Sequence, residues 1–299
     1  MIDFMRQLET KEIPLPNVFA LLLLSLFPLF VGATASAAPY ATDWVEGHNS
    51  KARLLVGGAP GLSGDIQRYV ALEIVMQPGW KTYWRQPGSA GGIPPQLNWQ
   101  GSVNLKQATL RFPAPTRMLD STGATIGYKK SVVLPIALEV ELPSRPVIVN
   151  LKALFGVCRE ICIPAQAAFK VTLGPGNFLQ SPPELVKALR RVPATRNEIV
   201  KNKPRLKAVR SDATGASGGN ALIFDVQFPG GTAGADLFAE SGDHLPLAMS
   251  EAVAEPSPEI IRYRIEVTDK EQWRDLAKNG IILTIVSDAA ASEVRTPRP

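Results

Sequence analysis

The chain has 299 residues, of which 45% are hydrophobic and 20% are charged, and its formal net charge is +5 at pH 7. This length exceeds one typical domain of ~100–150 residues, so we expect two domains. The densest basic cluster, at residues 201–210, contains a proline and no aromatic side chain, which argues against a nucleic-acid partner. We interpret the cluster as a solvated linker, with a docking patch for an acidic surface as the alternative.

The N-terminus carries the pattern of an export signal. An apolar run over residues 18–31 is followed by small residues that end in Ala-Ser-Ala at Ala37, and this ending is typical of a cleaved signal peptide. The run is shorter than the ~18 residues of a membrane-spanning helix, and Pro28 interrupts it. We therefore predict a signal peptide over residues 1–37, cleavage near Ala37, and no stable membrane span.

Residues 51–175 contain short apolar segments separated by Gly and Pro turns, which is the pattern of a β-sandwich or barrel. The predicted strands are Tyr69–Gln77, Trp80–Arg85, Val132–Leu142, Val147–Val157 and Gln166–Leu173. In the second of these, the period of two places Trp80, Thr82 and Trp84 on one face, which we assign to the core. Residues 88–95 contain Gly and Pro, so we predict a loop there.

The pattern changes after residue 176. Leucines at helical spacing predict a helix over Pro182–Arg191, and a polar, basic stretch follows. Further strands are predicted at residues 221–228, 260–267 and 281–286, with one short helix near residues 270–278. We therefore predict an all-β chain with two sandwiches in tandem, at residues 40–177 and 206–299, joined by a short, partly helical and basic linker at 178–205. The second domain has no cysteine, and we find no catalytic constellation in it.

Cys158 and Cys162 are the only two cysteines of the chain. Residues four apart in an extended strand are ~13 Å apart, whereas a disulfide requires α-carbons within about 7 Å. The chain must therefore turn between them. We predict a hairpin with one cysteine at each strand end, and Pro164 just after the pair fits a strand end.

The spacing alone leaves two roles for this pair open. As a staple, a disulfide that closes five residues would contribute only about 2 kcal/mol, against nearly 5 kcal/mol for a loop of about 100 residues. As an exchange site, the pair keeps both thiols together, so that one can resolve a mixed disulfide formed by the other. The two histidines, His48 and His244, lie far from the pair and do not match the spacing of a zinc site. We therefore expect no metal ion and no cofactor, and keep copper handling as a third interpretation.

Four sequence motifs occur in a familiar order. They are Pro78-Gly-Trp-Lys-Thr-Tyr-Trp-Arg-Gln-Pro-Gly, Phe112-Pro-Ala-Pro, Gly127-Tyr-Lys-Lys-Ser-Val-Val-Leu-Pro and Val157-Cys-Arg-Glu-Ile-Cys-Ile-Pro. Together they resemble the N-terminal periplasmic domain of the DsbD and ScsB family of thiol:disulfide interchange proteins, over roughly residues 45–175. Residues 206–299 resemble more loosely the second β domain of ScsB-type members.

The resemblance implies an immunoglobulin-like sandwich in the periplasm whose cysteines receive electrons from a membrane-embedded donor of the DsbD or CcdA type. The pair would pass them to periplasmic thioredoxin-like proteins, with Cys162 forming the mixed disulfide and Cys158 resolving it. Because the membrane-spanning and thioredoxin-like parts of the full-length family proteins are not found in this sequence, we expect the donor to be a separate protein. The main alternative remains a non-catalytic two-domain binding module with a structural disulfide.

The resemblance also implies a cap loop that shields the cysteines until a partner displaces it. By motif position this loop should lie within Thr122–Lys130, with Tyr128 as the first candidate for the lid and Ile126 as the second. The best-known family members have a longer spacing between the cysteines and acidic residues in the cap loop. Here only Asp120 is nearby, so we expect the acidity of the thiols to be set differently.

Overall fold

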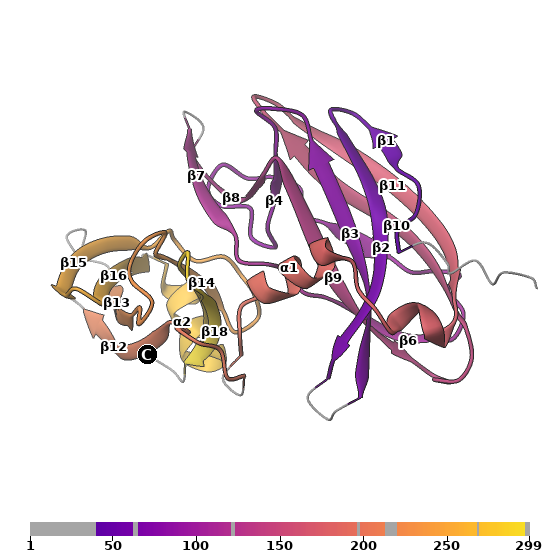
Figure 1. Cartoon of the computed structure of the whole chain (residues 1–299). Helices are drawn as coiled ribbons and strands as arrows, with labels where there is room; N and C mark the ends of the chain where they lie inside the picture. Colours follow the sequence, from indigo (N-terminus) through magenta and orange to yellow (C-terminus); the bar gives the residue numbers. More distant parts are fainter. Residues whose placement is uncertain are drawn as a thin grey trace, which may run out of the picture. The chain divides into compact units, whose positions relative to one another are not determined.

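The strands in the described part of the chain form four antiparallel sheets. Figure 1 shows them in the computed structural model. The structure describes residues 40–61, 65–120, 123–195, 198–212, 220–267 and 269–296. The predicted signal peptide at residues 1–37 lies outside these ranges. None of the helices in the described part of the chain has the length and apolar character that a membrane span requires.

Two sheets make up the N-terminal sandwich, residues 45–173. The first sheet has the strand order β1 (Val45–Gly47), β2 (Ser50–Pro60), β3 (Ile66–Met76), β9 (Ser131–Val140) and β6 (Leu105–Leu110). The second has the order β11 (Cys162–Leu173), β10 (Val147–Cys158), β4 (Lys81–Tyr83), β8 (Gly123–Lys129) and β7 (Thr116–Asp120), and β5 (Gln96–Asn98) also pairs with β10. Alternate residues of both sheets point inward and form one apolar core, which includes Leu72, Leu134 and Phe155.

The core face predicted for Trp80, Thr82 and Trp84 is confirmed. Thr82 and Trp84 are fully buried, and Trp80 packs against the core from a partly buried position. The strand itself is shorter than expected, because β4 covers only three residues and the chain leaves the sheet at Trp84. Residues 88–95 form a loop, as their Gly and Pro content predicted.

Two further sheets make up the C-terminal sandwich, residues 205–296. One has the order β12 (Arg205–Asp212), β13 (Asn220–Gln227), β16 (Ile260–Val267) and β15 (Glu251–Ser257), and the other has the order β14 (Asp236–Ser241), β17 (Ile281–Val286) and β18 (Ala291–Thr296). Their inner faces share a second core, which includes Phe224, Ile265 and Leu283. The expected all-β class with two sandwiches in tandem is therefore confirmed.

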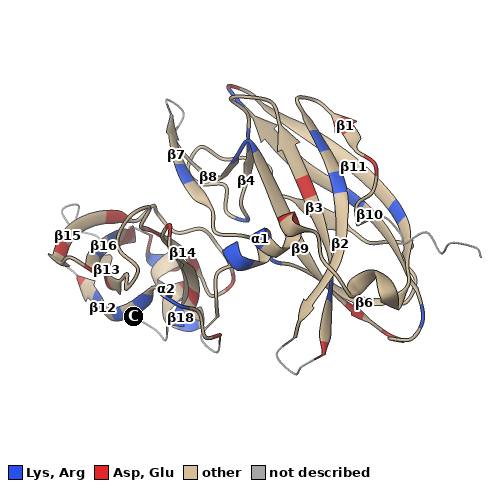
Figure 2. Cartoon of the chain, viewed as in Figure 1, with Lys and Arg blue, Asp and Glu red and all other residues tan. Residues whose placement is uncertain are grey.

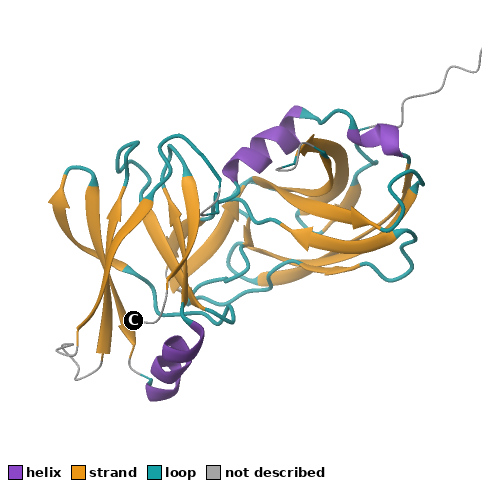
Figure 3. Cartoon of the chain, turned by 90° about the horizontal axis from the view of Figure 1, so that it is seen from below, coloured by secondary structure: helices purple, strands orange, loops and turns teal. Residues whose placement is uncertain are grey.

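The helices lie outside the sheets (Figure 3). The predicted linker contains a 3-10 helix, η1 (Pro175–Phe178), and α1 (Pro183–Arg191), whose Leu185 packs on Leu55 and Ala71 of the first sheet. This part of the connection is therefore a packed element. In the C-terminal sandwich, α2 (Lys270–Asn279) begins where the side chain of Asp269 accepts a hydrogen bond from the backbone of Glu271.

The basic cluster at residues 201–210 was predicted to be a solvated linker, and the structure differs from this prediction. Its second half is the edge strand β12, where Arg210 forms an ion pair with Asp225 on the neighbouring strand, at 2.8 Å. Figure 2 shows that basic and acidic residues are interspersed on the strands of this sandwich. Arg210 of β12 thus has a carboxylate partner on the next strand, which a sequence cluster alone does not reveal.

Candidate functional site

The two cysteines form the last residue pair of a long β-hairpin. Strands β10 and β11 are paired over twelve positions, and Cys158 lies directly opposite Cys162. Three residues, Arg159 to Ile161, connect the strands. The two sulfur atoms lie 2.9 Å apart, and both residues are free thiols.

The predicted hairpin is therefore present, but its second strand begins earlier than expected. Strand β11 starts at Cys162 rather than at Gln166, and it includes Pro164. Proline lacks a backbone donor and is tolerated in a strand at the edge of a sheet. Because β11 is the edge strand of its sheet, Pro164 does not end it.

The two thiols differ in their access to solvent. Cys158 is buried, with 7% of its surface exposed, whereas Cys162 is exposed. Ile161, directly before Cys162, is also exposed, at 72%. Cys162 is therefore the residue of the pair that an incoming reactant meets first, and Cys158 lies behind it.

Tyr83 is the side chain that contacts the exposed thiol. Its hydroxyl oxygen lies 2.5 Å from the Sγ atom of Cys162, although its ring is only 1% exposed. Strand β4 pairs with the end of β10, so that Lys81 lies opposite Cys158, and Tyr83 follows two residues later on the same face of the sheet.

Two glycines leave room for this tyrosine ring. A Cβ atom on Gly156 would lie 2.9 Å from the ring, and one on Gly92 would lie 2.2 Å from it. Gly92 belongs to the loop between β4 and β5, and the backbone N–H of Gly156 donates to the carbonyl of Ile93 in that loop, at 2.9 Å. The loop thus covers the ring, and β10 lies beneath it.

Burial and the neighbouring groups change the acidity of this cluster. Burial, followed by the hydrogen bond with Cys162, raises the pKa of the Cys158 thiol, while the Tyr83 hydroxyl and the charge of Lys81 act to lower it. Burial and the hydrogen bonds with both sulfurs raise the pKa of Tyr83 well above its usual range. The hydroxyl therefore stays protonated at neutral pH and can donate a hydrogen bond to a thiolate.

The structure places the two predicted cap residues elsewhere. Residues 123–129 form strand β8, and Tyr128 and Ile126 are buried members of the sandwich core. The Tyr128 hydroxyl donates to the carbonyl of Pro113, at 2.8 Å. In the strand register Tyr128 lies opposite Thr82, which lies opposite Val157, and these three share the core face of the sheet.

The cysteines belong to the other face of that sheet, where Tyr83 lies. The alternation that put Trp80, Thr82 and Trp84 in the core also puts Lys81 and Tyr83 on the opposite face. The sequence therefore indicated the face on which Tyr83 lies. It did not indicate that β4 pairs with β10, which brings Tyr83 to the cysteines.

The two histidines considered as metal ligands contact residues other than the cysteines. The His48 ring stacks edge-on against Trp80, with 6.2 Å between ring centroids, and His244 lies 3.5 Å from Glu240 in the C-terminal sandwich. Within the described ranges, no group of three or more His, Cys, Asp or Glu side chains is placed to hold a metal ion.

Known proteins share both the sequence of this region and the fold of the chain. Residues 64–173, which include both cysteines, match the family model described as thiol:disulfide interchange protein DsbD, N-terminal. The crystal structure of the N-terminal periplasmic domain of ScsB from Proteus mirabilis is similar, with a TM-score of 0.59 and 21% sequence identity over 87% of this chain and 99% of that chain. At this identity the likeness supports the fold, and it extends well beyond residues 64–173. No curated protein sequence matches the chain.

Proposed function

Because residues 64–173 match the family model of the N-terminal domain of the thiol:disulfide interchange protein DsbD, we propose that this chain exchanges disulfides through Cys158 and Cys162. The proposed site of action is the periplasm, after removal of a signal peptide near Ala37. The proposed partners are thioredoxin-like proteins as electron acceptors and a membrane-embedded protein of the DsbD or CcdA type as the donor.

The observation that carries this proposal is the unequal exposure of two adjacent thiols. Thiol-disulfide exchange begins when an accessible thiolate attacks a disulfide, and it ends when a second thiol attacks the mixed disulfide. Cys162 is exposed and fits the first role, while Cys158 is buried 2.9 Å behind it and fits the second.

The reaction can be written so that every electron and proton is accounted for. Cys162 first loses its proton to the solvent, and its thiolate attacks one sulfur of the partner's disulfide; a mixed disulfide forms, and the partner's other sulfur leaves as a thiolate that takes up a proton. Cys158 then loses its proton to the solvent and attacks the sulfur of Cys162, which releases the partner's second sulfur as a thiolate that also takes up a proton. The partner gains two electrons and two protons, and the Cys158–Cys162 disulfide is the oxidised product that the membrane donor must reduce again.

Lys81 supports the second step in this scheme. Burial keeps the Cys158 thiol protonated, and the positive charge of Lys81, which lies opposite it on β4, lowers the cost of forming the thiolate. The resolving thiol is thus held neutral in the resting dithiol and has a cationic neighbour when it must ionise.

Single cysteine variants test the assignment of roles. The reduced mature chain is mixed with an oxidised thioredoxin-like protein, and the products are separated on non-reducing gels. Cys158→Ser should accumulate a covalent complex with the partner, whereas Cys162→Ser should form none and should not reduce it. The double serine variant is the matched control. Trapping by Cys162→Ser alone would mean that the roles are reversed, and exchange by both single variants would refute the site.

The reduction potential distinguishes exchange from a structural disulfide. The mature protein is equilibrated in graded thiol buffers, and its alkylated cysteines are counted. A potential between roughly −270 and −120 mV, with the fold retained in both states, is expected of an exchange protein. A potential below about −300 mV would indicate a structural disulfide instead.

A further inference from the structure

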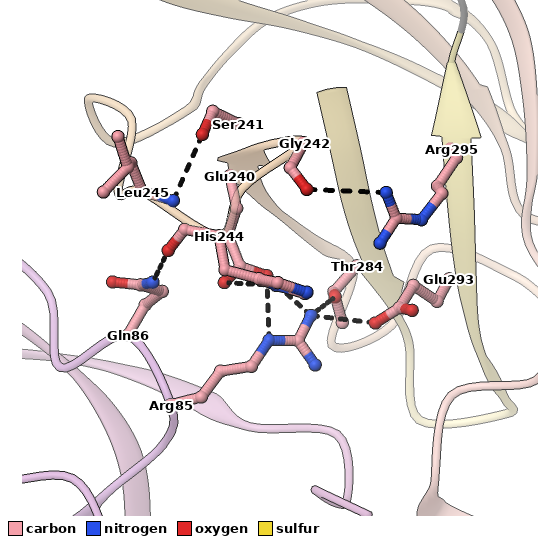
Figure 4. A network of polar contacts seen from close by, with 10 residues as sticks. All are labelled: Arg85, Gln86, Glu240, Ser241, Gly242, His244, Leu245, Thr284, Glu293 and Arg295. Carbon is pink, nitrogen blue, oxygen red and sulfur yellow. Dashed lines mark hydrogen bonds and ion pairs between the residues drawn. The ribbon is translucent and has the colours of Figure 1, made fainter. Parts of the chain in front are cut away.

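Arg85 connects the N-terminal sandwich to the C-terminal sandwich through a network of polar contacts (Figure 4). Its Nε and Nη2 atoms donate to Glu240 Oε2 at 2.8 and 2.6 Å. The Nη2 atom also donates to Glu293 Oε2 at 2.8 Å and to the Thr284 hydroxyl at 3.1 Å. Glu240 is 1% exposed, so this carboxylate depends on Arg85 for a charged partner.

The acceptors belong to three neighbouring strands of one sheet. Glu240 lies on β14, Thr284 on β17 and Glu293 on β18, and Thr284 and Glu293 are directly opposite each other in the register. Separating a buried carboxylate from the guanidinium that is paired with it is unfavourable, because the charge loses that compensation. The guanidinium therefore fixes its own backbone segment to this sheet.

The residues next to Arg85 contact the same sandwich. The side-chain amide of Gln86 donates to the carbonyl of His244, and the rings of Trp84 and Phe238 are 5.7 Å apart between centroids. Phe238 also belongs to the apolar core of the N-terminal sandwich. The two sandwiches belong to one compact unit, in which three successive side chains hold this segment to the C-terminal sheets.

Tyr83, the residue before Trp84, contacts the thiol of Cys162. The chain therefore passes from the hydroxyl beside Cys162 to the anchored guanidinium within two residues. After Arg85 it forms the loop that returns over the tyrosine ring at Gly92. The start of this loop is held by the C-terminal sandwich and also by the backbone N–H of Trp84, which donates to the carbonyl of Ile126 on β8 at 3.1 Å. Its end is fixed by the hydrogen bond between Gly156 and Ile93.

We infer that Arg85 is a positioning residue for the dithiol: by tying the end of β4 to the sheet of β14, β17 and β18, it holds the Tyr83 hydroxyl against Cys162. This gives the C-terminal sandwich a role in the chemistry of the thiols, although none of its described residues is seen to touch them. The inference rests on the proposed function in taking Cys162 as the attacking thiol, but the contacts that carry it do not depend on any partner.

Arg117 provides a matched control for this inference. It also crosses from the N-terminal to the C-terminal sandwich, where it donates to both carboxylate oxygens of Asp236 at 2.9 and 2.6 Å and to the carbonyl and hydroxyl of Ser250. Its side chain is 21% exposed, against 20% for Arg85. It starts, however, from β7, at the far edge of the sheet from the cysteine hairpin.

The test measures how fast iodoacetamide alkylates the reduced mature protein as the pH is varied. Arg85→Ala should slow alkylation at pH 7 by about twofold or more, the lower end of the coupling between residues linked through a backbone shift, and should move the pH midpoint upward. Arg117→Ala should leave both values unchanged. In a Tyr83→Phe background, Arg85→Ala should cause no further change, because the hydroxyl through which it acts is already absent.

If Arg85→Ala does not fold, Glu240→Gln tests the same inference. Glutamine keeps the shape of the glutamate side chain and one acceptor oxygen, but it removes the negative charge. The inference is overturned if Arg85→Ala or Glu240→Gln alkylates as the unmodified protein does. It is also overturned if Arg117→Ala has an equal effect, or if the effect of Arg85→Ala persists in the Tyr83→Phe background. Alkylation requires no protein partner, so a failure of the exchange assay would refute the proposed function and leave this result intact.

Discussion

Replacing Tyr83 by phenylalanine should make the reduced cysteine pair harder to ionise. The hydroxyl lies 2.5 Å from the sulfur of Cys162, and the raised pKa of Tyr83 keeps its proton in place while the thiols titrate. It therefore donates to a thiolate and stabilises the charged form. A hydrogen bond to a charged group contributes about 1.5–3 kcal/mol, and we take the lower value, about 1.5 kcal/mol, because water can reach the exposed Cys162 and replace part of the bond.

This energy corresponds to about one pH unit, since one unit equals about 1.36 kcal/mol. The two sulfurs interact, so the quantity to follow is the midpoint for the first proton that the pair loses. Tyr83→Phe should raise this midpoint by about one unit and slow alkylation about tenfold at a pH below it. Phenylalanine keeps the ring between Gly92 and Gly156, so the covering loop should stay in place.

The assay is the pH profile of iodoacetamide alkylation, followed by mass spectrometry of the reduced mature protein. The plateau rate at high pH reports access to the sulfur, and the midpoint reports its ionisation, so the two effects separate. An unchanged midpoint would mean that the hydroxyl makes no useful bond to the thiolate. A lower midpoint would mean that it stabilises the thiol by accepting from it, and would refute the reasoning.

Three further outcomes are expected. Reducing the disulfide should lower the Tm by only about 4–8 °C, because a five-residue loop contributes about 2 kcal/mol; unfolding on reduction would contradict this. Gly92→Ala, whose Cβ would lie 2.2 Å from the Tyr83 ring, should shift the alkylation midpoint as Tyr83→Phe does, whereas Gly91→Ala, with open space around it, should not. The hydrogen bond from Arg262 is the main cause that lowers the pKa of Asp225 to about 2, so its stabilising effect is present above about pH 4 and is lost toward pH 2. Asp225→Asn should therefore make the unfolding free energy depend less on pH between about pH 4 and about pH 2. Urea titrations at several pH values measure this, and the same dependence on pH in the variant would contradict the prediction.

Much of the fold follows from local patterns in the sequence. The alternation of apolar residues predicted strands close to β3, β10 and β16, and the helical spacing of leucines predicted α1. Strand ends were less predictable. Pro164 suggested an end, but β11 is an edge strand, where the missing backbone donor removes no ladder hydrogen bond.

The candidate site was predictable only in part. The spacing of the cysteines required a turn, and the hairpin brings them opposite each other. To predict the residue that covers the cysteines, one must know which face of β8 is turned toward them. The position of a motif in the sequence does not show this. Strand pairing places Tyr128 and Ile126 in the core and leaves Tyr83 as the side chain at the sulfur.

The sequence by itself thus determined the β class, the hairpin and the pairing of Cys158 with Cys162, because these depend on periods and spacings within a few residues. Only the tertiary structure decided that Tyr83 contacts Cys162, 79 positions away, and that Arg85 contacts Glu240, 155 positions away. Contacts at such separations depend on which strands pair and in which register. That choice is made by the packing of whole sheets, and no local pattern specifies it.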